Sequence, residues 1–337
     1  MKNLLNITKN KVLIVAEIGN NHEGNFKNAK KLILKAKQCG VDAVKFQTCN
    51  PNLFYSKSEK KKIKKLKKFN LNFNQLKKLS SIAKKNKLIF FSTPLDLESA
   101  TTLNKLQNIF KIASSDNNYL DLIKHVASFG KDMIVSTGLS DMNLLKKVNQ
   151  EILKVWKKNK ISANLAFTHC VSSYPTKFSE ANIFAVSTLK RFFKNIIIGY
   201  SDHTKDITSC LIAVSLGARI VEKHFTLDKN FSNFRDHKLS CDPREMTVMV
   251  NRIRLLEKMQ QFSSKKPQKS ELKSAKFSRR SCAANIDLKK GKILKDTHII
   301  GLRPLVGISI LNKKKIVNRT LKRNIAVGEI IKYRDIK

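Results

Sequence analysis

The chain has 337 residues, of which 42% are hydrophobic, and its formal net charge is +42 at pH 7. This length allows one large domain and a small one. No apolar run approaches the roughly 20 residues that cross a bilayer, so we expect no membrane role. The first residues lack the apolar region of a signal peptide. The six cysteines are scattered without a CxxC pair, which predicts a reduced, cytoplasmic protein.

The positive charge raises the possibility of nucleic-acid binding. The lysines, however, gather on segments with the pattern of amphipathic helices, such as residues 58–69 and 77–87. Aromatic residues are not interleaved with them as a base-stacking platform would require. We therefore expect a solvated helical exterior, with weak nonspecific binding to nucleic acid at low salt and no specific nucleic-acid partner.

Short apolar runs that end in chemically reactive residues recur along the first 225 positions. They cover residues 12–16, 41–44, 88–91, 109–110, 133–135, 165–167, 196–198 and 220–221. Helical patterns separate them, as in repeated βα units. The pattern predicts a (β/α)₈ TIM barrel, in which ligands bind at the carboxyl ends of the strands. An open doubly wound sheet is the alternative, although no glycine-rich dinucleotide motif follows any strand.

Helix boundaries are marked at several points between these runs. Residues 25–38 carry apolar side chains at helical spacing and stop before Gly40, which suits a C-terminal cap. Asp96 is expected to cap the start of another helix. A helix of small residues over 207–216 is expected to close at Gly217. These signals place helices between the strands, as a barrel requires.

The chain divides into three parts by composition. Residues 1–262 form the predicted barrel, and the polar stretch 263–278 is predicted to be a linker or an extended connection. Residues 279–337 contain a short repeat, in which Gly291 and Gly328 are each followed eight positions later by an isoleucine, Ile299 and Ile336. The repeat predicts a small, mostly β domain with pseudo-twofold symmetry.

His203 and His224 are the candidate metal ligands. They follow consecutive strands, which would bring both imidazoles to the same rim of a barrel. A single histidine is more often structural, so the prediction depends on the pair. Imidazoles would leave positions on Mn²⁺ for water and substrate oxygens. Asp236 is a candidate for orienting a ligand or a sugar, or alternatively a loop carboxylate paired with Arg235.

Lysines and hydroxyls at the strand ends form a candidate anion site. Lys45, Lys111 and Lys223 are predicted to point into or around the barrel mouth, where strand interiors normally exclude lysine. Hydroxyls near them complete a site for phosphate or carboxylate, namely Thr93, Ser114, Ser136 and Ser201. Glu17 is either a general base or positioning group, or the structural partner of a lysine. Cys170 is more plausible as a buried thiol than as a nucleophile.

Several of these motifs together resemble the sialic acid synthase (N-acetylneuraminate synthase) family. The matching segments are Glu17-Ile-Gly-Asn-Asn-His22, Lys45-Phe-Gln47, Ser92-Thr-Pro94, Lys111-Ile-Ala-Ser114, Ser136-Thr-Gly138, Tyr200-Ser-Asp-His203-Thr and Glu222-Lys-His224. The tail, with Arg279-Arg-Ser-Cys-Ala-Ala284, Lys290-Gly291 and Leu302-Arg303-Pro304, resembles the C-terminal antifreeze-like (SAF) domain of that family.

The resemblance implies a barrel enzyme that condenses phosphoenolpyruvate with an N-acylated hexose such as N-acetylmannosamine, giving a nine-carbon 2-keto-3-deoxy acid and phosphate. It implies Mn²⁺ or Mg²⁺ on His203 and His224, and catalytic roles for Glu17, Lys45 and Lys111. It also implies substrate contacts from Gln47, Thr93, Ser114, Ser136, Ser172, Tyr174, Ser201 and Asp236. The SAF domain would cap the partner's barrel in a domain-swapped homodimer, with Arg303 reaching the N-acyl group of the sugar.

Two departures from the family pattern lie near the implied sugar site. Ser172 stands where neuraminate-forming members commonly carry Asn, and Asn233-Phe-Arg precedes Asp236 in place of the frequent Gly-Pro. The acceptor could therefore be a modified hexose, as in legionaminic or pseudaminic acid synthesis. A sugar- or polyanion-binding barrel without catalysis is the alternative of a different class.

Overall fold

The computed structural model describes residues 3–260 and 264–337. The chain divides into two compact units, Met1–Phe262 and Ser263–Lys337. The predicted boundary between residues 262 and 263 lies outside the described residues. Among the helices that are described, none is both long and apolar enough to cross a membrane.

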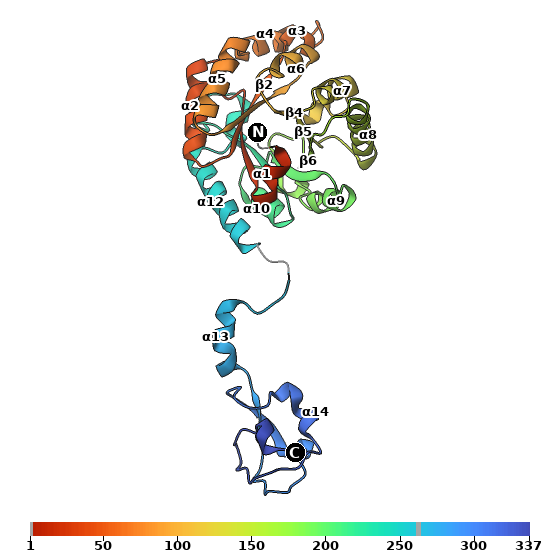
Figure 1. The fold of residues 1–337 in the computed structure, drawn as a ribbon. Helices are drawn as coiled ribbons and strands as arrows, with labels where there is room; N and C mark the ends of the chain where they lie inside the picture. Colours follow the sequence, from red (N-terminus) through yellow and green to blue (C-terminus); the bar gives the residue numbers. More distant parts are fainter. Residues whose placement is uncertain (1–2, 261–263) are drawn as a thin grey trace. The chain divides into compact units, whose positions relative to one another are not determined.

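The first unit is built on one eight-stranded parallel sheet in the order β3-β2-β1-β8-β7-β6-β5-β4. The two end strands, β3 and β4, also lie side by side, so the sheet curls into a barrel (Figure 1). The Gln107 side chain helps to close it, because it accepts a hydrogen bond from the Ser92 amide and donates one to the Ser92 carbonyl. The predicted TIM barrel is confirmed. The strands are β1 (Leu13–Gly19), β2 (Ala43–Thr48), β3 (Ile89–Pro94), β4 (Ile109–Ile112), β5 (Asp132–Ser136), β6 (Leu165–Cys170), β7 (Ile197–Asp202) and β8 (Ile220–His224).

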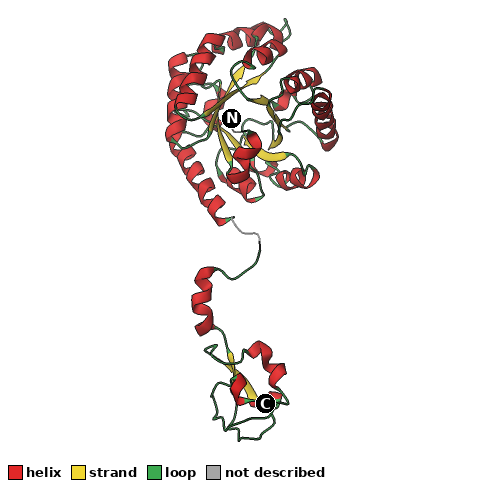
Figure 2. Ribbon diagram, viewed as in Figure 1, coloured by secondary structure: helices red, strands yellow, loops and turns green. Residues whose placement is uncertain are grey.

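Helices form the outer layer around these strands, as Figure 2 shows by colour. Two cap signals act as predicted: Asp96 accepts a hydrogen bond from a backbone amide at the start of α6, and Gly40 adopts a φ of +83° just after α2. Asn25 caps the start of α2 in the same way as Asp96 caps α6. The main helices are α2 (Phe26–Gln38), α4 (Lys60–Phe69), α5 (Phe73–Lys85), α6 (Leu97–Leu103), α7 (Leu120–Ser128), α8 (Met142–Lys158), α9 (Ala185–Phe192), α10 (Thr208–Ser215) and α12 (Pro243–Met259), with short α3 (Pro51–Phe54) and α11 (Arg235–Leu239).

The barrel interior changes from apolar to charged along the strands. Near their amino ends the inward positions are filled by Leu13, Val15, Phe91, Ile134 and other buried apolar residues. Helix α1 (Leu4–Asn10) adds Leu4 and Ile7 to this cluster. Because side chains in a strand alternate between faces, the next inward positions are polar, for example Glu17 on β1, Lys45 on β2 and Glu222 on β8. The apolar half thus supports a charged layer at the carboxyl ends.

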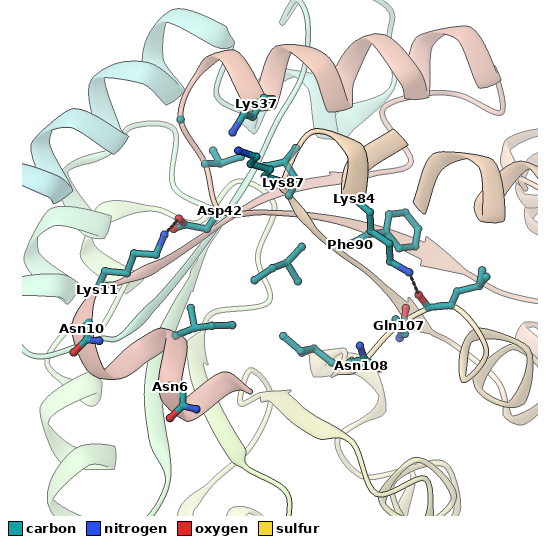
Figure 3. Close-up of a pocket in the computed structure, with 17 residues that line it drawn as sticks. Asn6, Asn10, Lys11, Lys37, Asp42, Lys84, Lys87, Phe90, Gln107 and Asn108 are labelled. Carbon is teal, nitrogen blue, oxygen red and sulfur yellow. Dashed lines mark hydrogen bonds and ion pairs between the residues drawn. The ribbon is translucent and has the colours of Figure 1, made fainter. Parts of the chain in front are cut away.

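A wide cavity lies at the amino-terminal end of the barrel (Figure 3). Its volume is about 920 Å³, and Lys11, Lys37, Lys84 and Lys87 line it together with amide side chains. Lys11 pairs with Asp42, and Lys84 donates a hydrogen bond to the Leu106 carbonyl. Each of the four lysines is exposed to solvent.

The second unit contains a small antiparallel sheet of β9 (Ser281–Ala284) and β10 (Ile299–Leu302), consistent with a small β domain. The two glycines of the repeat adopt positive φ angles, and each repeat ends in a short 3₁₀ turn, Asp296–His298 or Tyr333–Asp335. The segment predicted to be a linker or an extended connection is partly helical, since α13 spans Lys269–Ser278. Short α14 (Lys313–Ile316) follows β10.

Candidate active site

A small cavity at the carboxyl ends of the barrel strands gathers most of the predicted site residues. Seven of the eight strands contribute a side chain that was predicted to be a site residue, and β6 contributes the thiol of Cys170. The lining consists of Glu17, Lys45, Gln47, Thr93, Lys111, Ala113, Ser114, Ser136, Cys170, Tyr174, Ser201, His203, Glu222 and His224. The structure therefore brings together side chains that are up to 207 positions apart in the chain, from 17 to 224.

Glu222 lies at the centre of the charged layer. Its carboxylate is within 3.1 Å of the Lys111 ammonium through both oxygens, and its Oε1 lies 3.6 Å from the Lys45 ammonium. Burial opposes ionisation of Glu222, but Lys111 and Lys45 together lower its pKa to about 2. Glu222 is thus a carboxylate at neutral pH and holds both lysines in one place.

Glu17 forms the second half of this cluster. One of its oxygens lies 2.9 Å from the Lys45 ammonium, and the other accepts a hydrogen bond of 2.9 Å from Gln47. Burial raises the pKa of Glu17 above its usual value, against the effect of Lys45. Burial lowers the pKa of Lys111, while the two carboxylates outweigh burial at Lys45 and raise its pKa. The predicted pairing of Glu17 with a lysine is therefore present.

Hydroxyl groups surround the lysines. Lys45 donates to Thr93 Oγ1 at 3.1 Å, and Ser201 donates to Glu222 at 3.1 Å. Ser136 lies 3.1 Å from Thr168, and Ser114 accepts a hydrogen bond from the Gly138 amide. Ammonium and hydroxyl donors converging in a buried space can bind the oxygens of a phosphate or a carboxylate.

His203 and His224 lie together on one side of the cavity, with their ring centroids 5.4 Å apart. His203 Nδ1 lies 2.8 Å from the Val171 carbonyl, which can only accept, so this nitrogen is the donor, and in the neutral ring Nε2 carries the lone pair. Burial lowers the pKa of His224 to about 4, and its Nδ1 is buried without a hydrogen-bond partner among the described residues.

These two imidazoles suit a metal ion as a partial donor set. Neutral imidazole is a metal ligand, and the unpartnered nitrogen of His224 has no other interaction that would explain its burial. Among the described residues no group of three or more His, Cys, Asp or Glu side chains could hold a metal ion. A metal at His203 and His224 would therefore need water or substrate oxygens to complete its coordination.

Tyr174 and Asp236 border the histidines differently. The Tyr174 ring lies 4.1 Å from the His203 ring and contacts the Arg235 guanidinium at 4.6 Å. Asp236 is buried and pairs with Arg235 at 3.1 Å, as the structural alternative predicted, and it does not line the cavity. Its negative charge partly opposes the lowering of the His224 pKa by burial.

Ser172 and Arg303 are not part of this cavity. Ser172 lines a neighbouring cavity that also includes Cys170, and its buried hydroxyl lies close to Gly138, where an added Cβ would approach it to 2.4 Å. Arg303 is exposed and belongs to the second unit, so its predicted contact with the sugar stays a prediction.

Lys223 was predicted to point into or around the barrel mouth as part of the anion site, but it does not line the cavity. Lys223 is fully buried on the other face of the sheet, where it pairs with Asp202 at 2.6 Å. Neighbouring residues of a strand point to opposite faces, so Glu222 and His224 cannot face the cavity together with Lys223. The missed residue is Glu222, which the sequence showed only as part of a motif. Its position two residues before His224 was the available signal.

The fold and the site define a TIM-barrel protein with buried cations, carboxylates and paired imidazoles at the carboxyl ends of its strands. The chain belongs to the NeuB family, whose family model matches residues 32–265. An uncharacterized protein of Methanocaldococcus jannaschii is 40% identical over 96% of this chain and 94% of its own length. The N,N'-diacetyllegionaminic acid synthase of Campylobacter jejuni is 37% identical over 96% of this chain and 99% of its own.

A solved structure of a sialic acid synthetase is also similar to this chain. The N-acetylneuraminic acid (sialic acid) synthetase of Leptospira borgpetersenii superposes with a TM-score of 0.72 at 32% identity. The match covers 79% of this chain and 90% of that protein.

Proposed function

We propose that the protein condenses phosphoenolpyruvate with an N-acylated hexose, giving a nine-carbon 2-keto-3-deoxy acid and inorganic phosphate. The observation that carries this proposal is the buried cluster in which Lys45 and Lys111 meet at Glu222 beside His203 and His224. This cluster supplies cations that can bind the phosphate and carboxylate of phosphoenolpyruvate next to the proposed metal site. Membership of the NeuB family supports a synthase of this type.

The proposed reaction forms one carbon–carbon bond and releases phosphate. Carbon 3 of phosphoenolpyruvate bonds to the aldehyde carbon of the open-chain sugar, and the aldehyde oxygen gains a proton. Water then adds to carbon 2, and phosphate leaves as that carbon becomes a ketone. Lys45 and Lys111 would hold the phosphate and carboxylate with Thr93, Ser114, Ser136 and Ser201, while Glu17 would orient or deprotonate a reacting group.

His203 and His224 would hold Mn²⁺ or Mg²⁺. The ion would supply Lewis-acid polarisation of the acceptor aldehyde, a contribution worth several kcal/mol in metal enzymes. The support in this chain is the His203 ring, whose Nδ1 donates to the Val171 carbonyl so that Nε2 carries the lone pair in the neutral ring, and the Nδ1 of the buried His224, which has no hydrogen-bond partner among the described residues. Tyr174, Gln47, Ser172 and Asp236 are proposed to contact the sugar.

The second unit is proposed to be an SAF domain that covers the barrel of another subunit in a homodimer, with Arg303 reaching the N-acyl group. Its repeated glycine turns and its small antiparallel sheet support a compact β domain. A cover of this kind would exclude water until the condensation step. A cytoplasmic location is proposed from the cysteines, which are all free and buried.

The acceptor is proposed to be a modified N-acylated hexose, as in legionaminic acid synthesis, with pseudaminic acid and N-acetylneuraminic acid synthesis as alternatives. The support is Ser172 in place of the asparagine common in neuraminate-forming members, together with 37% identity to the Campylobacter jejuni synthase over nearly its whole length.

Phosphate release in the presence of an acceptor panel tests the proposal. The purified full-length protein is given phosphoenolpyruvate, Mn²⁺ and each of several N-acylated mannosamines and bacillosamine-derived hexoses. We expect phosphate release that requires both an acceptor and the metal, with a 2-keto-3-deoxy acid detected by mass spectrometry. No release with any acceptor, with Mn²⁺ or with Mg²⁺, would count decisively against it.

A sugar- or polyanion-binding barrel without catalysis is the second candidate, favoured only by the net charge of +42. The intact pairing of Glu17, Lys45, Lys111 and Glu222 speaks for catalysis instead. Fluorescence anisotropy with labelled single-stranded DNA separates the two. Binding that survives near-physiological salt would support the second candidate, because nonspecific phosphate contacts weaken steeply with salt.

A further inference from the structure

A buried ion pair lies directly behind the two histidines. Asp202 on β7 and Lys223 on β8 are register partners, their side chains are fully buried, and their charged atoms are 2.6 Å apart. They occupy the outer face of the sheet, while the neighbouring Ser201 and Glu222 line the cavity on the inner face. Neither residue has a role in the proposed reaction, so the pair is unexplained.

The Lys223 ammonium donates hydrogen bonds to three acceptors. Besides Asp202, it donates to the Thr204 carbonyl and to the Asp206 carbonyl, the latter at 3.0 Å. An ammonium has three hydrogens, so its hydrogen-bonding capacity is filled. The lysine thus anchors the segment that follows β7, in which His203 lies.

Asp202 anchors the same segment from the other side. It accepts hydrogen bonds from the Thr204 amide at 2.9 Å, from the Thr204 hydroxyl at 3.1 Å and from the Tyr200 hydroxyl at 2.8 Å. The residues on both sides of His203 are therefore tied to Lys223, which itself directly precedes His224. One network fixes the backbone next to both imidazoles.

Stability alone is a weak reason for such a pair. Burying two charges costs several kcal/mol per ion, and well-packed apolar residues often replace a buried pair without loss of stability. Removing one partner is costly, because the other charge is left unpaired. Where buried ionic groups are retained, fixing one conformation is a recognised reason.

We propose that Lys223 is a positioning residue, which together with Asp202 sets the separation and orientation of the His203 and His224 imidazoles for one metal ion. This inference rests on the metal site of the proposed function. Groups that orient metal ligands from outside the coordination shell typically change metal affinity 10- to 100-fold when they are removed. The effect of losing Lys223 should therefore appear in metal binding as well as in turnover.

The test is Mn²⁺ binding to the metal-free, full-length protein, followed by electron paramagnetic resonance of the free ion. Lys223→Met removes all the donors, and Asp202→Asn removes the charge at nearly constant volume. We expect each variant that remains folded by circular dichroism to bind Mn²⁺ about 10- to 100-fold more weakly than the wild type. Asp202→Asn decides the question if Lys223→Met does not fold.

Asp132→Asn is the matched control. Asp132 is also a buried carboxylate at a strand end, but it lies at the amino end of β5 and accepts from the amides of Leu4 and Asn164. It should lower stability while leaving Mn²⁺ affinity unchanged. Wild-type affinity in the folded Asp202→Asn or Lys223→Met protein would overturn the positioning role.

The His203→Ala variant distinguishes a failure of the metal site from a failure of the positioning role of Lys223. If this variant loses Mn²⁺ while Lys223→Met keeps wild-type affinity, the metal site stands and the positioning role fails. If the wild type itself binds no Mn²⁺, the metal site of the proposed function fails and the positioning role fails with it.

Discussion

The two ends of the barrel hold their charges in different ways. At the amino-terminal end, exposed lysines line a cavity of about 920 Å³. At the carboxyl end the cavity is only about 50 Å³, but Lys45 and Lys111 are almost fully buried against Glu17 and Glu222. Water screens an exposed lysine, whereas a buried one interacts strongly with whatever enters beside it.

The larger cavity is therefore at the end with solvated charges, and the smaller cavity is at the end with buried ones. Charges at the carboxyl end have been removed from water at a cost, and each is matched by partners from other strands. At the amino end the charges are solvated, and Asp42 serves to join Lys11, Arg254 and the Ile14 amide. We expect substitutions at the carboxyl end to change turnover and those at the amino end to change only stability.

The largest effect is expected for His203→Ala. It removes one of two proposed metal ligands, and losing several kcal/mol of transition-state stabilisation lowers turnover about 10³-fold or more. The measurement is phosphate release together with metal content by atomic emission. Metal content and turnover equal to those of the wild type would refute the role of His203.

Glu222→Gln is expected to have the next largest effect. It leaves Lys45 paired with Glu17 and removes the ion pair of Lys111 with Glu222. Losing one partner of a buried pair costs about 3–5 kcal/mol of stability, and we expect kcat/KM for phosphoenolpyruvate to fall about 100-fold. Urea denaturation and steady-state kinetics measure the two effects.

The matched control for Glu222→Gln is Glu180→Gln. Glu180 forms a surface pair with Lys177 at 3.9 Å, and both side chains are largely exposed. Its loss should change stability by less than about 1 kcal/mol. If Glu222→Gln behaves like this control, Glu222 is not the centre of the charged layer.

Asp42→Asn extends the comparison to the other end of the barrel. Asp42 pairs with Arg254 at 2.6 Å and accepts from the Ile14 amide at 2.9 Å. We expect a loss of about 1–3 kcal/mol in the free energy of unfolding, because partners of Asp42 lose their charged acceptor. Thermal unfolding measures this loss, and kcat below the melting range should stay unchanged. A large fall in kcat without unfolding would mean that the two ends are coupled.

The smallest effect is expected for Ser172→Asn, which restores the residue common in neuraminate-forming members. The Ser172 hydroxyl already lies close to Gly138, so a larger side chain must turn towards the neighbouring space. We expect a change of about tenfold or less in the ratio of kcat/KM for two acceptors, the range that single pocket contacts give. An unchanged ratio over the whole acceptor panel would remove Ser172 from the sugar site.

Much of the barrel could be predicted from the sequence, because its signals are local. Apolar runs, the cap residue Asp96 and glycines after helices each act within a few positions. Strand ends then converge because a parallel barrel leaves no other arrangement for them. The same reasoning placed Glu17, Lys45, Lys111, His203 and His224 at one rim.

Side-chain partners could not be predicted in the same way. Lys223 was expected in or around the mouth because a lysine in a strand is unusual, but side chains alternate along β8, which places Lys223 on the outer face and Glu222 on the inner face. The pairing of Asp236 with Arg235 was one of two alternatives that only coordinates could separate. Helix α13 lies in a polar segment without the apolar periodicity from which a helix is predicted, so the segment was predicted to be a linker or an extended connection.

Phosphate release by two variants, compared side by side, tests whether the reaction takes place at the buried carboxyl end of the barrel. Lys111→Gln removes a buried ammonium there, and Lys87→Gln removes an exposed one at the larger cavity. We predict that Lys111→Gln lowers kcat/KM for phosphoenolpyruvate about 100-fold or more and that Lys87→Gln leaves it unchanged. Wild-type activity in Lys111→Gln, or a comparable loss in Lys87→Gln, would contradict that location.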